Sequence, residues 1–498
     1  MQHAGPYLQV EDDLLRGVSL RSTLKGLGWM WRKSALRVPE GTWQRQWECL
    51  HRVQTYNVFI SHTWKSSGSL KVLALMLRCG WQTALSFWLF SLFAIVFVQV
   101  VFPDVPQPFK LDKPVISFDA EYPLAPWLLI AGPLALLMGL FCTPYFPKCC
   151  RLSKEETCFV DIACIHQADE ALKERGIYGI GGFLRHAEEL RVLWTPPYLT
   201  RLWCVFELAA YRVANPTGKI SLAPIFIEHS VFILAPAFWA ASWCYSLSLA
   251  AGLPNYGYLL GEALPIGVAL LPLLGFVHGL RRLFREKHKL YEDLKQFKLA
   301  SAECSEPFDY IFVTSAIHRW YGSAEEFERF VQGPLFNEIS GNSTKTVDVP
   351  LAYCLLLVTA PVSATIDETI GLWSAGAPVD VVLSSLLGHA YSIGVCCSLV
   401  SIKLLYYLCD RFAVARRPGL IDYLQTVLIY TSWSGFFLLG SYTGELSYRH
   451  SLKAAACHAS ITTVVAVFVC SWKFISDSLS ACRRLLKAND KFPKQPSA

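Results

Sequence analysis

The chain has 498 residues, of which 53% are hydrophobic and only 17% are charged, and its mean hydropathy is +0.34. This composition is too apolar for a soluble globular protein, so we expect several segments to lie in lipid. The formal net charge of +6 is small for this length. Because no nucleic-acid-binding motif accompanies it, nucleic acid is excluded as a partner.

The first 80 residues contain one clear strand signal. Residues 1–53 are polar and basic, with a short amphipathic helix expected over 20–37, and the sequence gives them no role. Residues 56–61 (YNVFIS) alternate and are rich in β-formers, which predicts a strand. A loop and a helix over 70–80 follow.

Two charge-free apolar runs at 81–102 and 124–142 have the length of membrane-spanning helices and form a predicted hairpin. The flank that follows carries Lys148, Arg151 and Lys154. By the positive-inside rule this flank faces the cytosol.

Alternating β and α elements are predicted for residues 153–229. The pattern favours strands over 157–160, 191–195 and 220–227, helices over 183–189 and 202–213, and a long loop over 162–182. Because two membrane crossings return the chain to its starting side, the strand at 56–61 and this block can form one sheet.

Three further hairpins and one soluble piece complete the chain. The apolar runs lie at 231–252, 258–280, 350–373, 381–409, 421–442 and 454–475. Residues 286–342 have helical periodicity, and we expect them to pack against the α/β block. The count is about eight transmembrane helices, with the soluble domains and both termini in the cytosol.

The resulting organisation is a membrane α-helical bundle plus a cytosolic α/β domain interrupted by a transmembrane hairpin. Its parts are an N-terminal lead-in (1–53), a split α/β domain (54–80 and 153–229), a hairpin insert (81–142), a second hairpin (231–280), a cytosolic helical segment (281–348), four transmembrane helices (349–476) and a cytosolic tail (477–498).

Several motifs resemble a known family. Residues 56–61 resemble the first-strand signature Y-D-V-F-I-S of Toll/interleukin-1 receptor (TIR) domains, and 159–161 (FVD) resemble the second strand of that fold. Tyr198 followed by LWCVFEL at 202–208 is similar to the family's Y-x-x-S-x-W-C-x-x-E-L helix. The resemblance covers about a fifth of the chain, a size adequate for one small domain, and implies a flavodoxin-like parallel sheet. The membrane hairpin and the long loop after Asp161 depart from the family pattern.

The resemblance implies two functions. TIR domains are self-associating signalling modules or enzymes that cleave NAD between nicotinamide and ribose. In the second case the catalytic glutamate corresponds to Glu207, whose carboxylate would stabilise positive charge developing on the ribose. Taken alone, Glu207 is an ordinary solvated helix residue; within the motif it is expected to line a cleft. Residues expected to flank that cleft and contact NAD are Ser61, His62, Trp64, Asp161 and Trp203.

The signalling and assembly interpretation is slightly favoured, with NAD a possible substrate and no cofactor or metal expected. Partners are the lipid bilayer and, through the TIR-like domain, other copies of the chain. Cys158, Cys164 and His166 match no standard zinc spacing. The glycines at 176–183 (GIYGIGGF) lack the ending of a phosphate-binding loop and predict a hinge.

A channel or transporter is the third possibility. Titratable residues occur in or near the apolar runs, where such groups are costly: Glu262, Asp367, Glu368, Asp380, His389 and Lys403. Most lie near predicted helix ends, where they can reach the interface. Only His389 and Lys403 are expected to be deeply placed.

Overall fold

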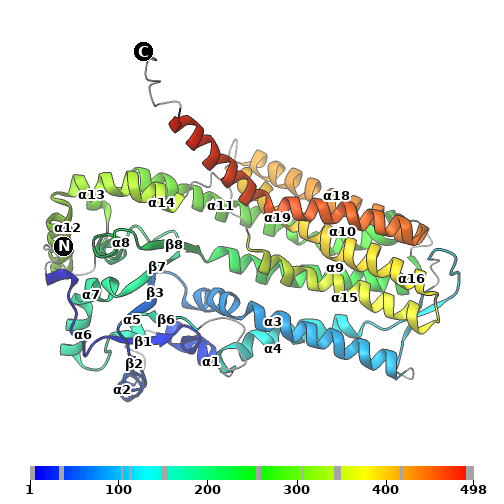
Figure 1. Ribbon diagram of the computed structural model, residues 1–498, viewed down its shortest axis with the longest axis horizontal. Coiled ribbons are helices and arrows are strands. Elements are labelled where there is room, and N and C mark those ends of the chain that lie inside the picture. The colour runs from blue at the N-terminus through cyan, green and yellow to red at the C-terminus, as the bar shows by residue number, and fades with distance from the viewer. Residues whose placement is uncertain are drawn as a thin grey trace, which may run out of the picture. The chain divides into compact units, whose positions relative to one another are not determined.

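The structure, a computed structural model, describes residues 6–32, 39–102, 105–111, 115–146, 155–253, 257, 259–304, 307–340, 349–414 and 419–489. The chain divides into two compact units (Figure 1). The first, here the α/β unit, combines Met1–Thr83, Leu140–His229 and Glu286–Gly341. The second, here the helical unit, combines Ala84–Gly139, Ser230–Arg285 and Asn342–Ala498. The basic flank at 148–154 and the last nine residues lie outside the described residues.

A six-stranded mixed sheet forms the centre of the α/β unit, in the order β2-β1-β6-β3-β7-β8. Its strands are β1 (Arg16–Ser19), β2 (His51–Arg52), β3 (Tyr56–Ser61), β6 (Thr157–Phe159), β7 (Ala187–Trp194) and β8 (Lys219–Pro224). The pairs β6–β3, β3–β7 and β7–β8 are parallel, while β1 runs antiparallel to both of its neighbours. The parallel strands therefore stand in the order second, first, third, fourth along the chain.

Aromatic side chains from two neighbouring strands build the core over this sheet. Phe59 on β3 stacks on Phe159 on β6 with ring centroids 4.5 Å apart, and Phe183 packs on Phe159 at 4.6 Å. All three residues are buried, with exposed fractions of 1% or less. Burial of such large rings contributes several kcal/mol each by area, roughly 2–3 kcal/mol per side chain.

The helices of the α/β unit flank this sheet. They are α1 (Lys25–Arg32), α2 (Glu40–Glu48), α5 (Asp161–Cys164), α6 (Glu170–Tyr178), α7 (Ile180–Arg185), α8 (Leu202–Ala214), α12 (Pro307–Tyr321), α13 (Ala324–Phe330) and α14 (Phe336–Ser340). The loop predicted over 162–182 is thus wrong, because this stretch forms short helices. The helix predicted over 183–189 is also displaced, since Ala187 already begins β7.

The N-terminal residues take part in the sheet. β1 pairs with β6 through Val18 and Cys158, and β2 covers the outer edge of β1. The helix predicted over 20–37 is shorter, and it follows a turn in which Gly26 and Gly28 have φ of 58° and 63°. Residues 33–38 lie outside the described residues.

Residues that follow the second membrane hairpin return to the α/β unit, as predicted. Arg201 forms a β-bridge with Glu303. Arg212 on α8 forms an ion pair with Glu338 on α14. These contacts attach the segment to both ends of α8, which packs against α7 and α12.

Long apolar helices make up the helical unit and its connections. They are α3 (Gly68–Val101), α4 (Trp127–Cys142), α9 (Phe226–Ala250), α10 (Leu264–Leu270), α11 (Leu273–Lys295), α15 (Leu351–Ser374), α16 (Val379–Ser384), α17 (Ser398–Arg411), α18 (Leu420–His450) and α19 (Leu452–Asn489). The helical unit also has two π-helical segments. One, η7 (Leu259–Ala263), leads directly into α10, and the other, η10 (Ser385–Cys397), connects α16 to α17.

Within the described part of the chain, six of these helices are long and apolar enough to cross a membrane, or seven if the bent pair 259–270 and 273–295 is one span. The predicted apolar run at 421–442 lies within α18, which is long but is not among them. The chain is therefore a membrane-embedded helical protein with a mixed α/β unit.

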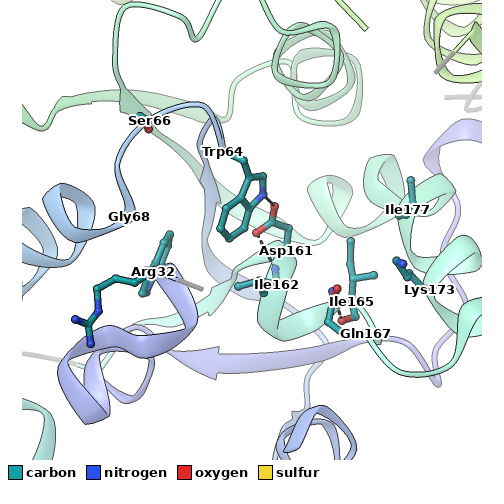
Figure 2. Close-up of a pocket in the computed structure, with 11 residues that line it drawn as sticks. Arg32, Trp64, Ser66, Gly68, Asp161, Ile162, Ile165, Gln167, Lys173 and Ile177 are labelled. Atoms are coloured by element: carbon teal, nitrogen blue, oxygen red, sulfur yellow. Dashed lines mark hydrogen bonds between the residues drawn. The ribbon is translucent and has the colours of Figure 1, made fainter. Parts of the chain in front are cut away.

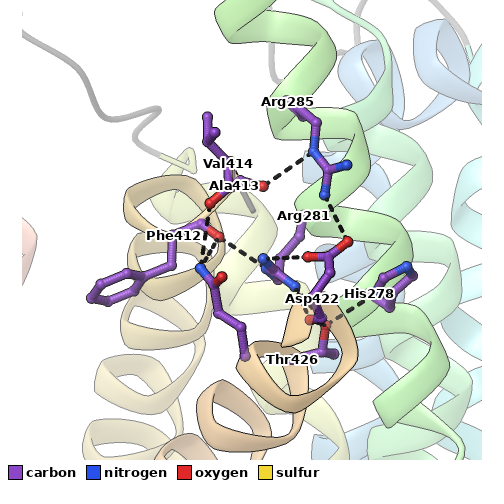
Figure 3. Close-up of polar contacts among 9 residues, drawn as sticks. His278, Arg281, Arg285, Phe412, Ala413, Val414, Asp422 and Thr426 are labelled. Carbon is purple, nitrogen blue, oxygen red and sulfur yellow. Dashed lines mark hydrogen bonds and ion pairs between the residues drawn. The ribbon is translucent and has the colours of Figure 1, made fainter. Parts of the chain in front are cut away.

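Different contacts hold the helices together at two places in the helical unit. At one end a small antiparallel pair, β4 (Phe109–Leu111) and β5 (Tyr122–Leu124), packs on α15, and the amide of Ile116 donates to the carbonyl of Arg449 at 2.8 Å. At the other end Arg281 and Arg285 on α11 both contact Asp422 on α18, at 2.8 and 3.2 Å (Figure 3).

Candidate functional site

The candidate site lies at the carboxyl ends of the parallel strands. β3 is flanked by β6 on one side and by β7 on the other. The connection that leaves β3 therefore runs to one side, towards β6, and the connection that leaves β7 runs to the other side, towards β8. In open α/β sheets this point of reversal is where ligands bind.

Glu207, on α8, is linked to the end of β3. The hydroxyl of Ser61 donates to Oε2 of Glu207, and it also lies 2.5 Å from the hydroxyl of Tyr198. Ser61 and Tyr198 are each 1% exposed, whereas Glu207 is partly buried. The predicted pairing of these motifs in space is therefore present.

Burial raises the pKa of Glu207 to about 8, from its ordinary value of 4.5. The hydrogen bond from Ser61 opposes this rise and the negative charge of Asp161 adds to it. The carboxyl group therefore carries its proton through most of the neutral range. A protonated carboxyl cannot supply a negative charge.

His62 and Asp161 form a second group beside the first. Nε2 of His62 lies 3.9 Å from Oδ1 of Asp161, which is too long for a hydrogen bond. The indole of Trp64 donates to Oδ2 of Asp161 at 2.7 Å. Burial lowers the pKa of His62 to about 4, because its charged form would lose solvation. His62 is therefore neutral at physiological pH.

Lys71, in the first turns of α3, is completely enclosed in this group. Its ammonium group donates to the carbonyl of Thr63 at 2.6 Å and lies 5.2 Å from the centre of the Trp64 ring. Lys71 therefore fixes the loop after β3 through its hydrogen bond to Thr63.

A cavity of about 490 Å³ opens next to Asp161 (Figure 2). This volume falls in the range of small-molecule sites, roughly 300–1,000 Å³. Its lining residues come from α1, the loop after β3, α5 and α6: Trp31, Arg32, Trp64, Ser66, Gly68, Asp161, Ile162, Ile165, Gln167, Lys173 and Ile177. Glu207, Ser61 and His62 are not among them. The six predicted residues thus do not share one cleft, since only Trp64 and Asp161 line this cavity.

Trp203 lies apart from both groups. Its indole donates to Oδ2 of Asp309 on α12 at 3.0 Å, and its ring packs near Phe206 and Phe312. It therefore fixes α12 to α8. The sequence contained no sign of this contact, because the segment that covers Trp203 arrives about a hundred residues later.

Three site residues were missed from the predicted set. Tyr198 was recognised only as part of the motif, although its position three residues after Thr195 places it over the end of β7. Lys71 had one available signal, a single cation among apolar residues at the start of α3. Cys204 also belongs here, since its thiol contacts the carbonyl of His62 at 3.6 Å.

The cysteine and histidine cluster that follows β6 has a packing role. Cys164 contacts the carbonyl of Cys158 at 3.8 Å, and His166 accepts from the amide of Asp169 at 2.9 Å. Among the residues that the structure describes, no group of three or more His, Cys, Asp or Glu side chains is placed to hold a metal ion.

The titratable residues of the apolar helices are placed differently from the prediction. Asp367 and Glu368 are buried inside the protein, with exposed fractions of 1% and 0%. Lys403 donates to the carbonyl of Val349, just before α15 begins, at 2.5 Å. Asp380 is exposed, and the side chain of Glu262 lies outside the described residues.

Comparison with known proteins adds no constraint: no protein-family model, no curated protein and no solved structure matches the chain. The function is therefore argued from the geometry alone.

Proposed function

We propose that this chain is a multi-pass membrane protein whose α/β unit is a TIR-like signalling and assembly module on the cytosolic side. The strand order second, first, third, fourth supports this proposal, because it is the start of the flavodoxin-like order. The link between Ser61 and Glu207 supports it too, since it joins the two motifs that carry the resemblance.

The environment of Glu207 argues that the module acts without catalysis. The carboxyl group of Glu207 is engaged by Ser61, holds its proton to about pH 8 and does not line the cavity. A neutral carboxyl gives little electrostatic stabilisation to a positively charged ribose. The geometry thus favours an internal structural role for Glu207.

Incubation of the full-length protein with NAD tests this assignment. We expect no nicotinamide release above that of a Glu207→Ala variant, whether the protein is dilute or concentrated. Release that depends on Glu207 would overturn the non-catalytic role. Self-association is tested in parallel by crosslinking the full-length protein in nanodiscs that each hold two copies, and crosslink-free copies would contradict an assembly function.

NAD cleavage by Glu207 is the second candidate. The large cavity favours it, because Asp161 and Trp64 on its wall are adjacent to His62 and Ser61 in the same cluster. In this case ligand binding would have to expose and ionise Glu207. The nicotinamide assay separates the two candidates.

We further propose that α18 is an eighth span, which would place both termini on the cytosolic side. Its 31 residues reach about 46 Å, more than the hydrocarbon thickness of about 30 Å. Its first turn holds Asp422, bonded to the basic end of α11, and its last turn holds Arg449, bonded to Ile116 of the opposite hairpin.

Hydroxyl groups explain why α18 is less apolar than the other helices. The side chains of Thr431, Ser432, Ser434 and Thr443 donate to carbonyls four residues earlier in the same helix. Because these hydroxyls are satisfied within the helix, they cost less in lipid than their hydropathy implies.

A further inference from the structure

A buried acid and a histidine face each other inside the helical unit. Glu368 on α15 and His389 on η10 have exposed fractions of 0% and 4%. Nδ1 of His389 lies 3.4 Å from Oε2 of Glu368. Ionisable groups inside a membrane bundle are costly and are a poor source of stability. Their presence points to a function.

Three tyrosines from three other elements surround this pair. Tyr122 on β5 donates to Oε1 of Glu368 at 3.1 Å, and Tyr245 on α9 donates to Oε2 at 2.9 Å. The hydroxyl of Tyr245 also lies 3.2 Å from Nε2 of His389. The ring of Tyr448 on α18 stacks on the imidazole with planes 4° apart. Both members of the pair are thus held in fixed positions.

The neighbouring ionisable groups are engaged elsewhere. Asp367 accepts from the amides that begin α4, His458 on α19 bonds to Ser392 and Thr443, and Arg449 on α18 pairs with Glu445. Among the residues that the structure describes, His389 is the one ion-pair partner of Glu368. No fixed cation among these residues therefore balances the carboxylate, and a proton shared with the imidazole can do so.

The backbone is also unusual at this point. His389 lies within the 13-residue π-helical segment η10. Wide turns of this kind occur frequently at functional sites. The preceding Gly388 permits the approach of α18, because a Cβ atom there would lie 2.5 Å from Cβ of Tyr448.

A small cavity borders His389. Its volume is about 60 Å³, enough for water, which needs roughly 10–15 Å³ per molecule. Polar side chains on its wall include Ser242, Tyr245, Thr365, His389 and Ser441. Water in this cavity would have hydrogen-bonding partners and would contact His389 directly.

We propose that Glu368 and His389 form an intramembrane proton-binding site, which exchanges its proton with water in the adjacent cavity. With one titratable proton the pair is neutral overall. Release of that proton leaves the carboxylate unbalanced, and uptake of a second leaves an uncompensated imidazolium. Each step is a proton transfer between water and Nδ1 or Oε2, and no other reactant is required.

Infrared difference spectroscopy of the full-length protein in lipid nanodiscs tests this site. We expect a carboxylic acid band of a group outside water to change between weakly acidic and weakly alkaline pH. Asp367 is a second buried acid and contributes a band of its own. The band of Glu368 should be lost in Glu368→Gln. It should persist in Asp367→Asn, which alters the adjacent buried acid, and in Asp380→Asn, which alters an exposed one.

A second variant keeps the test informative if Glu368→Gln folds poorly. Tyr245→Phe retains the ring but removes a hydrogen bond that favours the ionised carboxylate, so proton binding should tighten about tenfold. The titration midpoint should then shift upward by about one pH unit. The proposal is overturned if no band is lost in Glu368→Gln while persisting in Asp367→Asn, or if the band that meets this condition does not respond to pH in the wild type.

Discussion

Glu207 holds its proton more tightly in the folded chain than in water, because its carboxyl group is enclosed beside Ser61 and Tyr198. Its pKa is about 8 in the fold and ordinarily 4.5. Between these values the folded form retains a proton that the unfolded form has released. The free energy of unfolding must therefore fall as pH rises through this window, and level off above it.

Replacement of Glu207 by Gln should remove this pH dependence. The amide mimics the protonated carboxyl, so the stability of the variant relative to the wild type should increase from pH 4.5 towards pH 8. The slope is at most about 1.4 kcal/mol per pH unit. Thermal unfolding followed by tryptophan fluorescence at several pH values measures it, and parallel profiles for the two proteins would contradict the assignment.

Sequence motifs predicted part of the site. The remaining residues could not be predicted, because their positions depend on packing between segments distant in the chain. Ser61 and Glu207 meet because a strand end and a helix start lie at the same sheet edge. Trp203 is one helical turn before Glu207, yet it contacts Asp309 instead of the cleft. Which neighbour covers a helix face depends on segments distant in the chain, and no local pattern encodes that.

At the scale of elements, close approach of backbones explains the glycines of GIYGIGGF. A Cβ atom on Gly181 would lie 2.0 Å from the carbonyl oxygen of Tyr7, and one on Gly182 would lie 2.5 Å from the carbonyl carbon of Gln9. These glycines therefore seat the N-terminal segment on α7. The predicted hinge is wrong, because both residues are buried within a helix.

Gly181→Ala should displace the N-terminal segment from α7. We expect increased protease sensitivity before β1. The free energy of unfolding should fall by roughly 1–3 kcal/mol, the usual cost of overpacking. Gly41→Ala is the matched control, since α2 has open space at that position and alanine favours helix. Equal protease sensitivity and equal stability of the two variants would show that the close approach at Gly181 does not contribute to stability.

Strands with apolar runs were predictable, whereas short polar elements were not. β3 and β7 have four or five successive buried residues, which periodicity detects. The stretch 162–182 forms helices of four to nine residues with many charges, so it looked like a loop. β1 is only four residues long, and its pairing with β6 depends on tertiary contacts.

The corner of α11, α17 and α18 depends on one buried arginine. Arg281 donates to the carbonyls of Phe412 and Asp422 and to Thr426, besides its ion pair with Asp422 (Figure 3). Arg281→Met would leave Asp422 with the half-exposed Arg285 as its remaining cation.

We expect Arg281→Met to destabilise this corner by about 3–5 kcal/mol, the cost of breaking a buried pair. Hydrogen exchange at the first turns of α18 should become faster in this variant. Arg282→Met, which changes an exposed neighbour on the same helix, should leave the exchange rates at their wild-type values. Unchanged exchange in Arg281→Met would show that Arg285 alone secures Asp422.

At the scale of the whole molecule, the composition of the two units constrains the number of crossings. The α/β unit is one compact body built from three separate stretches of chain. If this body lies on one side of a membrane, each excursion between its stretches must cross an even number of times. α3 and α4 satisfy this rule for the first excursion, and α9 satisfies it for the second only if the bent pair ending in α11 is a span.

The side of the membrane on which Ser451 lies decides whether α18 crosses. If α15 and the helix 379–411 both cross, they return the chain to the side of the α/β unit. If α18 spans, Ser451 lies on the opposite side, together with Glu121 of the β4–β5 hairpin. The hydrogen bond between Ile116 and Arg449 requires this arrangement, because it joins the hairpin to the last turn of α18.

Labelling with a membrane-impermeant maleimide on intact cells tests this topology. Glu121→Cys and Ser451→Cys should both react before permeabilisation, whereas the native exposed Cys49 on α2 should react only afterwards. Peptide mass spectrometry identifies the labelled residue, so other cysteines do not interfere. Labelling of Ser451→Cys only after permeabilisation would mean that α18 does not cross, and α19 would then carry the C-terminal residues to the outer side.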